Sequence, residues 1–389
     1  MLKLKARWIF PVGSTPIQDG VVCVDDDRIV EIRRGRAGQG VRDLGNVAIL
    51  PGWVNAHTHL ELSGINAPLG YPGIPLVEWI RLVVDRRRAE SHDAAWAVRR
   101  GLDECEIAGA AAVGDIVQPS PDLHETPIAV TGFLELIGPT EARTAEALQT
   151  AAAYAGAGQG RGGRRFGLSP HAPYSVRPGL VEGACRLSRE YHVPVAFHLA
   201  ESREEIQLLR DSSGPFRRLL ERLDAWDPAS QPACRRPLDF LRMLAEADRA
   251  LVIHGNYLDE EEIAFLAERR ERMSVVYCPR THAWFQHDPY HLEPMLAAGV
   301  NVALGTDSRA SSPDLNLLEE MRHVARCHPN VPPEKIIEMG TLSGAKALGI
   351  EQEFGTLEPG KSARLAIVDL PDCRIDDPYE LLLGNRSAD

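Results

Sequence analysis

The sequence lacks any CxxC pair, although it contains seven cysteines. An odd number of scattered cysteines is typical of reduced thiols rather than of a disulfide framework, so we predict a cytoplasmic protein. No apolar run approaches the roughly 18 residues that a membrane span needs, and we expect no membrane partner. The first residues, MLKLKARWIF, also lack the long apolar core and the small-residue cleavage site of a signal peptide.

A basic excess is missing as well. The formal net charge is −12, and an acidic balance argues against a nucleic-acid partner, which would require a basic face. Hydrophobic residues make up 44% and charged residues 25%, as in ordinary globular proteins. We therefore expect a globular protein without a nucleic-acid partner, and a homodimer stays open because nothing in the helix faces decides it.

Short apolar runs alternate with stretches of helical length from Pro51 to about Glu351. Near-continuous apolar strands that alternate with helices are typical of a parallel sheet covered by helices. Eight such runs predict an α/β fold, a closed (β/α)8 TIM barrel whose working face lies at the C-terminal strand ends. The runs are GWVNAHTH, AAVGDIV, IAVTGFLELIG, FGLSPHAPY, VPVAFHLAES, RALVIHGNY, MSVVYCPR and VNVALGTDS.

The two ends of the chain have a different pattern of apolar residues, one that is typical of short strands. The first fifty residues alternate apolar and polar positions between Gly, Asp and Asn, and the tail FGTLEPGKSARLAIVDL is again strand-like. We therefore predict a small composite β-sandwich domain from residues 1–50 and 350–389. The barrel is expected over residues 51–349.

Polar side chains interrupt the apolar runs where the strands end. His57 and His59 are two apart and point to the same face of an extended chain, and His198, His254 and Asp307 end three other strands. Taken singly, each has a structural explanation: a strand-end histidine is more often a packed core residue, and an aspartate after Gly-Thr usually caps a helix or a turn. Five such residues on four strands favour a shared pocket instead. Three imidazoles and a carboxylate suit zinc, and iron nearly as well.

Glu201 follows His198 by three residues. If the chain bends off the strand there, its carboxylate reaches a metal-bound water, whose pKa the metal lowers toward about 7. Attack on an aromatic carbon that bears an amine needs two proton transfers, and one carboxylate can serve both. The alternative is a helix N-terminal residue favoured by the helix dipole, since SREE follows.

Together these motifs resemble the amidohydrolase superfamily, and most closely its cytosine/adenosine deaminase and chlorohydrolase-like branch. The resemblance is carried by PGWVNAHTHLELS, SPHAPYSV, FHLAES, VIHGNYLD and GTDSRASSPDLNLLEEM. It implies that His57, His59, His198 and Asp307 bind the metal, with Asp307 also accepting the proton of the water. It further implies that Glu201 is the proton shuttle and that His254 orients the attacking water or the substrate.

Four further residues are candidate substrate contacts. The resemblance places His171 against the substrate and Trp79 in the pocket lining, whereas a turn residue and a helix core residue are the alternatives. Glu61 is in phase with the two histidines and is expected to face the pocket, unless it is a surface carboxylate. His282 lies in CPRTHAWFQHDPYHL, which differs from the Ser-Asn motif usual in this branch. Aromatic side chains in this segment either stack on a planar base or pack the loop.

The fourth run, FGLSPHAPY, contains no lysine. Branches with two metals carry a carboxylated lysine there, so the resemblance implies one divalent ion, Zn²⁺ first and Fe²⁺ as the alternative. NAHTHLELS is similar to the corresponding sequence segment of aminodeoxyfutalosine deaminases. We therefore predict a mononuclear aminohydrolase that deaminates an adenine-containing nucleoside, with 6-amino-6-deoxyfutalosine as the first candidate.

Two alternatives remain at this stage. The same pocket chemistry would release chloride from a triazine or open another carbon–nitrogen bond, as in cyclic amidohydrolases. A non-catalytic scaffold on the same fold is the alternative outside enzymes, because a fold alone does not fix a function. Lost ligands would mark a scaffold, and all the expected ligands are present.

Overall fold

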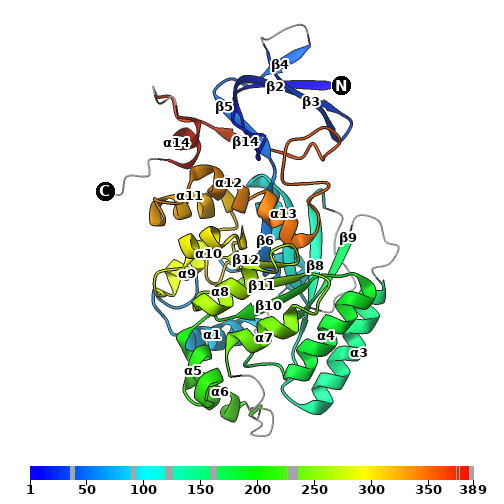
Figure 1. Cartoon of the computed structure of the whole chain (residues 1–389), viewed down its shortest axis with the longest axis vertical. Coiled ribbons are helices and arrows are strands. Elements are labelled where there is room, and N and C mark those ends of the chain that lie inside the picture. The colour runs from blue at the N-terminus through cyan, green and yellow to red at the C-terminus, as the bar shows by residue number, and fades with distance from the viewer. Residues whose placement is uncertain are drawn as a thin grey trace.

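An eight-stranded parallel barrel forms the body of the protein (Figure 1). The computed structural model describes residues 1–35, 40–88, 93–118, 126–157, 164–223, 225–226, 235–373, 375 and 377–384. The strands are hydrogen-bonded in chain order, and a parallel bridge between Thr58 and Asp307 links the first strand to the segment after the last. They are β6 (Trp53–Thr58), β7 (Ala110–Val117), β8 (Ala129–Leu136), β9 (Arg164–Pro170), β10 (Val195–Leu199), β11 (Ala250–His254), β12 (Met273–Tyr277) and β13 (Asn301–Leu304).

The barrel strands are buried on both faces. Every residue of β10, β11 and β12 is buried, because helices cover the outside and side chains fill the inside. This explains why the strands read as continuous apolar runs rather than as alternating ones. The predicted (β/α)8 barrel with its eight strands is confirmed.

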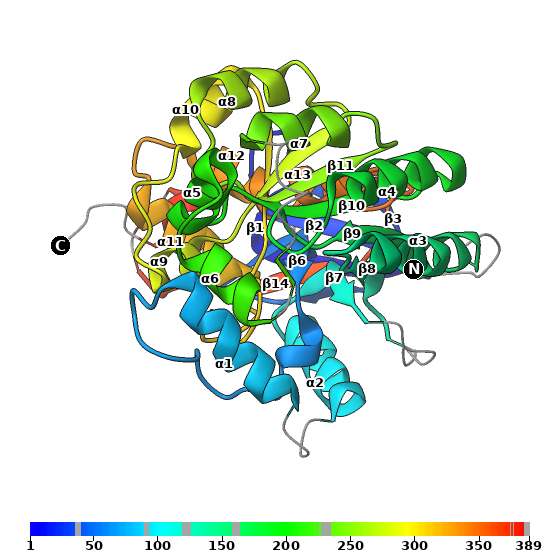
Figure 2. The same cartoon turned by 90° about the horizontal axis from the view of Figure 1, so that it is seen from below.

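Helices surround the barrel on its outer side, as the view from below shows (Figure 2). Residues 141–157 form the helix α3, which the sequence pattern did not predict. Its apolar positions are mostly alanines and only Ala151 and Ala155 are buried, so it shows little contrast between two faces. The helices are α1 (Leu76–Arg88), α2 (Ala94–Ile107), α3 (Glu141–Ala157), α4 (Pro178–Tyr191), α5 (Arg203–Asp211), α6 (Pro215–Arg222), α7 (Pro237–Leu244), α8 (Glu260–Ala267), α9 (Pro279–Trp284), α10 (Leu292–Ala298), α11 (Leu317–Cys327), α12 (Pro333–Met339), α13 (Leu342–Leu348) and α14 (Pro378–Leu383), with a 3₁₀ turn η1 at Leu60–Leu62.

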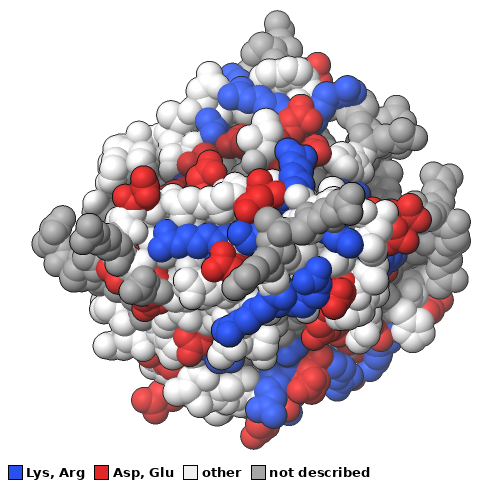
Figure 3. Space-filling view, turned by 90° about the horizontal axis from the view of Figure 1, so that it is seen from above, with Lys and Arg blue, Asp and Glu red and all other residues white. Residues whose placement is uncertain are grey.

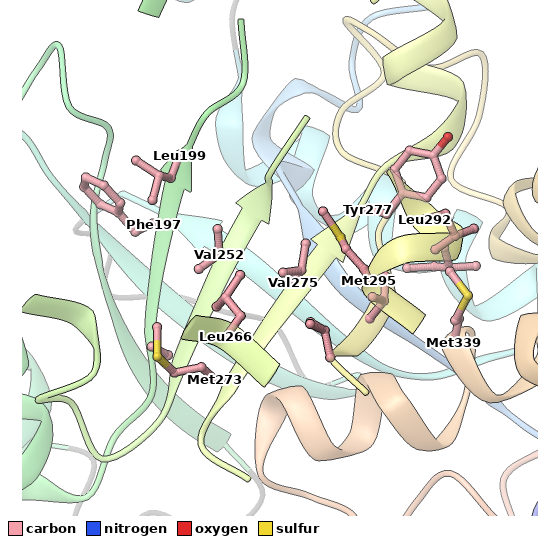
Figure 4. Close-up of a cluster of buried hydrophobic side chains, with 14 of the residues drawn as sticks. Phe197, Leu199, Val252, Leu266, Met273, Val275, Tyr277, Leu292, Met295 and Met339 are labelled. Carbon is pink, nitrogen blue, oxygen red and sulfur yellow. The ribbon is translucent and has the colours of Figure 1, made fainter. Parts of the chain in front are cut away.

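The main hydrophobic core lies between the strands and these helices (Figure 4). Val252 of β11 and Val275 of β12 belong to the same buried cluster as Leu266 of α8 and Met295 of α10. Complete burial of one such side chain contributes about 1.5–3 kcal/mol to folding. This packing fixes the positions of the strands, and so it also fixes the positions of the residues at the strand ends.

The two ends of the chain meet in a separate β-sheet domain (Figure 1). β14 (Leu365–Asp369) pairs antiparallel with β5 (Val47–Pro51), with Ile367 opposite Ile49. The sheet continues through β1 (Leu2–Ile9), β2 (Ile17–Asp25) and β3 (Arg28–Arg34), and β4 (Val41–Asp43) pairs with β1. The exact division of the chain at residues 50 and 350 stays a prediction.

The surface carries charges of both signs. On the face in Figure 3, Lys and Arg side chains lie interspersed with Asp and Glu side chains. In the part of the chain that the structure describes, no helix is both long enough and apolar enough to cross a bilayer.

Candidate metal centre

Three histidines converge inside the mouth of the barrel. His57 lies within β6, His59 follows that strand directly, and His198 lies in β10. One nitrogen of each ring lies within 4.8 Å of the corresponding nitrogens of the other two. The alternation of side chains along β6 puts the first two on the same face, and the convergence of the strand ends brings in the third.

The hydrogen bonding and the protonation of these three rings are those expected of metal ligands. His57 Nε2 is buried and has no hydrogen-bond partner within the described chain, which is costly for a polar atom unless a ligand satisfies it. His198 Nδ1 is 3.0 Å from the carbonyl oxygen of His171, so its Nε2 is left for the cluster. Burial lowers the pKa of His57 and His59 well below the usual value and that of His198 to about 3. All three rings are therefore neutral, the form that binds zinc or iron.

Asp307 completes the set. Its Oδ1 lies 3.7 Å from His57 Nε2 and 3.8 Å from His59 Nε2, while the hydroxyl of Ser311 donates to its Oδ2 at 2.8 Å. The backbone N–H of Asp307 also donates to the carbonyl of His57 at 3.1 Å. Burial raises the pKa of Asp307 to about 6, against hydrogen bonds that include those from Ser311 and Thr281. The four predicted ligands thus lie together, and their binding of a metal stays a prediction.

Glu201 and His254 lie beside this cluster. Glu201 Oε1 is 3.4 Å from His254 Nε2, and both side chains are buried. Burial, followed by the nearby charge of Asp307, raises the pKa of Glu201 well above its usual value, and burial likewise lowers that of His254. A protonated carboxyl beside a neutral imidazole is suited to deliver a proton to a bound molecule.

A cavity of about 480 Å³ opens over these residues. His59, His198, Glu201, His254 and Asp307 form its inner wall. Apolar side chains from α1 and α6 form much of the remainder. These are Leu76, Ile80, Val83, Val84, Leu219 and Leu220.

The four predicted substrate contacts divide into two pairs. His171 and Trp79 line the cavity, and Trp79 Nε1 donates to the carbonyl of Ala310 at 2.9 Å. Glu61 and His282 are not among the lining residues. Glu61 lies in the η1 turn and pairs with Arg87, and the His282 ring packs 5.7 Å from Tyr277 and 5.6 Å from Tyr290.

Several polar lining residues have no counterpart among the predicted contacts, among them Arg88, Arg143, Tyr174 and Ser175. Glu135 of β8 and Arg87 of α1 both face the cavity. Glu135 is a carboxylate inside the apolar run IAVTGFLELIG, and a polar residue near the end of a barrel strand is the signal that would have identified it. Arg87 lies on an amphipathic helix with several other arginines, and no local pattern distinguishes it from them.

Comparison with known proteins gives a consistent result. A model of the amidohydrolase family matches residues 48–387. The chain is 28% identical over 408 residues to a 5-methylthioadenosine/S-adenosylhomocysteine deaminase of Moorella thermoacetica, covering 97% of this chain and 88% of that protein. It is 29% identical over 364 residues to the aminodeoxyfutalosine deaminase of Deinococcus radiodurans, covering 88% of this chain and 84% of that protein.

A solved structure shares the fold. The crystal structure of Helicobacter pylori aminofutalosine deaminase in complex with methylthio-coformycin matches with a TM-score of 0.85 at 22% identity, over 98% of this chain and 95% of that one. The match to the family and the three-histidine cluster support a divalent metal in this protein.

Proposed function

Because this chain belongs to the amidohydrolase family, we propose that it hydrolytically deaminates an adenine-containing nucleoside, with 6-amino-6-deoxyfutalosine as the first substrate to test. The chain is a hydrolase of carbon–nitrogen bonds that acts on a small molecule. The observation that carries the proposal is the contact of Glu201 with His254 beside the three-histidine cluster, inside a cavity with apolar walls. Relatives that bear deaminase names support the choice of an adenine ring.

The metal would be held by His57, His59, His198 and Asp307, with Zn²⁺ as the first candidate and Fe²⁺ as the alternative. When bound, it supplies an activated water at neutral pH. One ion is expected, since the three-histidine cluster is the only candidate metal-binding group found among the described residues. Asp307 would accept the proton of the attacking water, and His254 would orient that water or the substrate.

Glu201 handles the two proton transfers that deamination needs. Its protonated carboxyl gives a proton to the ring nitrogen as water adds to the carbon that bears the amine. The ionised Glu201 then takes the remaining proton of the added hydroxyl and passes it to the amine, the carbon–nitrogen bond breaks, and the oxo-purine and ammonia are the products. Through solvent, Asp307 gives up the proton of the water and Glu201 regains one, which restores the starting state. Burial raises the pKa of Glu201, which favours the protonated form that can give the first proton.

The assembly and the location of the protein belong to the same proposal. Six described cysteines are free, which supports a reducing compartment, and we propose the cytoplasm. A homodimer remains a prediction to be tested by the solution mass.

The test is ammonia release from a panel of adenine nucleosides, followed by the variant Glu201→Gln. General acid–base catalysis contributes about 10²–10⁴-fold, so the variant should lose that much in kcat while it retains its metal. Glu204→Gln is the matched control, because Glu204 lies three residues away in α5 and outside the cavity lining. A Glu201→Gln protein with full metal content and wild-type kcat would remove the proposed role. Chloride release from a chlorotriazine without ammonia release from nucleosides would favour the chlorohydrolase alternative.

A further inference from the structure

His254 points into the cavity against the alternation of its own strand. Along β11, Val252 belongs to the core between the barrel and the helices, whereas Ile253 belongs to a second buried cluster, most of whose members come from barrel strands. An extended chain would therefore direct residue 254 toward the helices. Its ring instead lines the cavity, with its centroid 5.5 Å from that of His198 and its Nε2 3.4 Å from Glu201 Oε1.

A tight turn at His254 produces this change of direction. Its φ is 67°, in the left-handed region that is unfavourable for a residue with a Cβ. Across it, the N–H of Gly255 donates to the carbonyl oxygen of Ile253 at 3.1 Å. A positive φ with a hydrogen bond between residues two apart defines a γ-turn of the rare, strained type. Such strain persists only where surrounding contacts hold it in place.

The hydroxyl of Tyr290 provides such a contact. Tyr290 lies between α9 and α10, is buried, and donates to the carbonyl oxygen of His254 at 2.9 Å. Its ring stacks on that of Tyr277 in β12, with the centroids 3.8 Å apart and an interplanar angle of 11°. Because β12 is the neighbour of β11 in the barrel, this stack fixes the hydroxyl relative to the strand that ends in the turn. Burial also raises the pKa of Tyr290, so the hydroxyl keeps its proton.

We propose that Tyr290 is a positioning residue whose hydrogen bond holds the γ-turn and so keeps the His254 ring in the cavity beside Glu201. Tyr290 is not among the residues that line the cavity, so it acts through His254. The inference rests on the role that the proposed function gives to His254. Without the hydroxyl, the turn can relax toward the direction of the strand alternation, and the chemical step should suffer more than substrate binding.

The experiment is a double-mutant cycle of Tyr290→Phe with His254→Ala. Tyr290→Phe should lower kcat by about 10- to 100-fold and change KM by less than about twofold, because it misplaces a group that acts on the reacting atoms. In the His254→Ala background the same change should cost less than about twofold, since effects that pass through one residue are not additive.

Tyr154→Phe is the matched control for the loss of a tyrosine hydroxyl. The hydroxyl of Tyr154 in α3 also donates to a barrel-strand carbonyl, that of Gly132 in β8, at 2.9 Å. Tyr154 does not line the cavity, so this variant should leave kcat unchanged even where its Tm falls.

A second readout follows the His254 ring without any catalysis. In NMR spectra of the protein with ¹⁵N-labelled histidine, the His254 signals are assigned by their absence in His254→Ala. They should shift in Tyr290→Phe and stay in place in Tyr154→Phe. If Tyr290→Phe fails to fold, Tyr277→Leu replaces it, because it removes the ring on which Tyr290 stacks and should give the same loss with the same dependence on His254.

Three outcomes would overturn the inference: an unchanged kcat in Tyr290→Phe, the same fold loss in both backgrounds, or His254 signals that do not move. Failure of the proposed function looks different. If the wild-type enzyme releases no ammonia from any nucleoside, the nucleoside assignment is lost, whereas the NMR comparison still decides whether Tyr290 positions His254.

Discussion

The side chain of Glu205 holds the backbone that carries Glu201. Glu205 Oε1 accepts a hydrogen bond from the N–H of Ala200 at 2.7 Å, and Oε2 accepts one from the N–H of Glu201 at 3.1 Å. Ala200 has a φ of 54°, a left-handed conformation that is costly for a residue with a Cβ. The first turn of α5 therefore fixes the bend that aims Glu201 at the centre.

Removal of this support should misplace Glu201. In Glu205→Ala, two buried N–H groups lose their acceptor, so we expect a lower apparent Tm and a fall in kcat of about 10- to 100-fold, because misplacement of a catalytic group by about 1 Å is sufficient for a loss of that size. Steady-state kinetics and metal analysis on the same preparation check this. Glu204→Ala should behave like the wild type. An unchanged kcat in Glu205→Ala would show that the bend holds without it.

The sequence pattern predicted the parts of the site that depend on strand geometry. His57 and His59 were predicted to lie together because side chains alternate along β6, and His198 and Asp307 because barrel strands end at one mouth. Such reasoning works only while the chain remains extended. Glu61 shows the limit: it is in phase with the two histidines, yet a 3₁₀ turn begins at Leu60 and the alternation stops there.

Residues beyond the strand ends depend on loop conformation, which the pattern does not encode. His282 lies in α9, which begins at Pro279, and its ring packs beside Tyr277 and Tyr290. Its contact with the substrate stays a prediction. Glu205 likewise depends on loop conformation, because its role arises from a bend after β10. Local sequence gives no measure of such bends, because tertiary contacts stabilise them.

The affinity for metal should depend on pH in a way set by Asp307. Burial keeps the pKa values of the three histidines low, that of His198 at about 3, so no imidazole takes up a proton near neutrality. Burial raises the pKa of Asp307 to about 6, so its carboxyl gains a proton as pH falls through that value and must lose it before binding metal. We expect nearly constant affinity above about pH 7 and a one-proton decrease below about pH 6. Competition titrations of the metal-free protein with Zn²⁺ measure this, and a multi-proton decrease near pH 6.5 would contradict it.

Trp79 has two possible roles, as a residue that contacts the substrate in the pocket or as a residue of the helix core. It lines the cavity, its Nε1 donates to Ala310, and its ring lies 5.4 Å from that of Phe285. If the ring stacks on the substrate base, Trp79→Ala should raise KM by about tenfold or more, since stacking contributes about 1–3 kcal/mol per base, and Trp79→Phe should recover most of the loss. Kinetics and thermal melts of both variants decide the question. A lower Tm with an unchanged KM would leave only the structural role.

Gly114 of β7 allows the close approach of the strand that carries His57. A Cβ at this position would lie 2.6 Å from the carbonyl oxygen of Ala56 and 2.9 Å from Leu348 Cδ2, so Gly114→Ala must push β6 outward. We expect a loss of roughly 1–3 kcal/mol in stability, as is usual for overpacking, together with weaker retention of the metal because His57 moves with Ala56. Gly179→Ala is the control, since a Cβ there meets nothing within 4 Å and alanine favours the first turn of α4. Apparent Tm and metal content after dialysis against a weak chelator distinguish the two variants, and a Gly114→Ala protein that matches the control in both would show that β6 adjusts without moving His57.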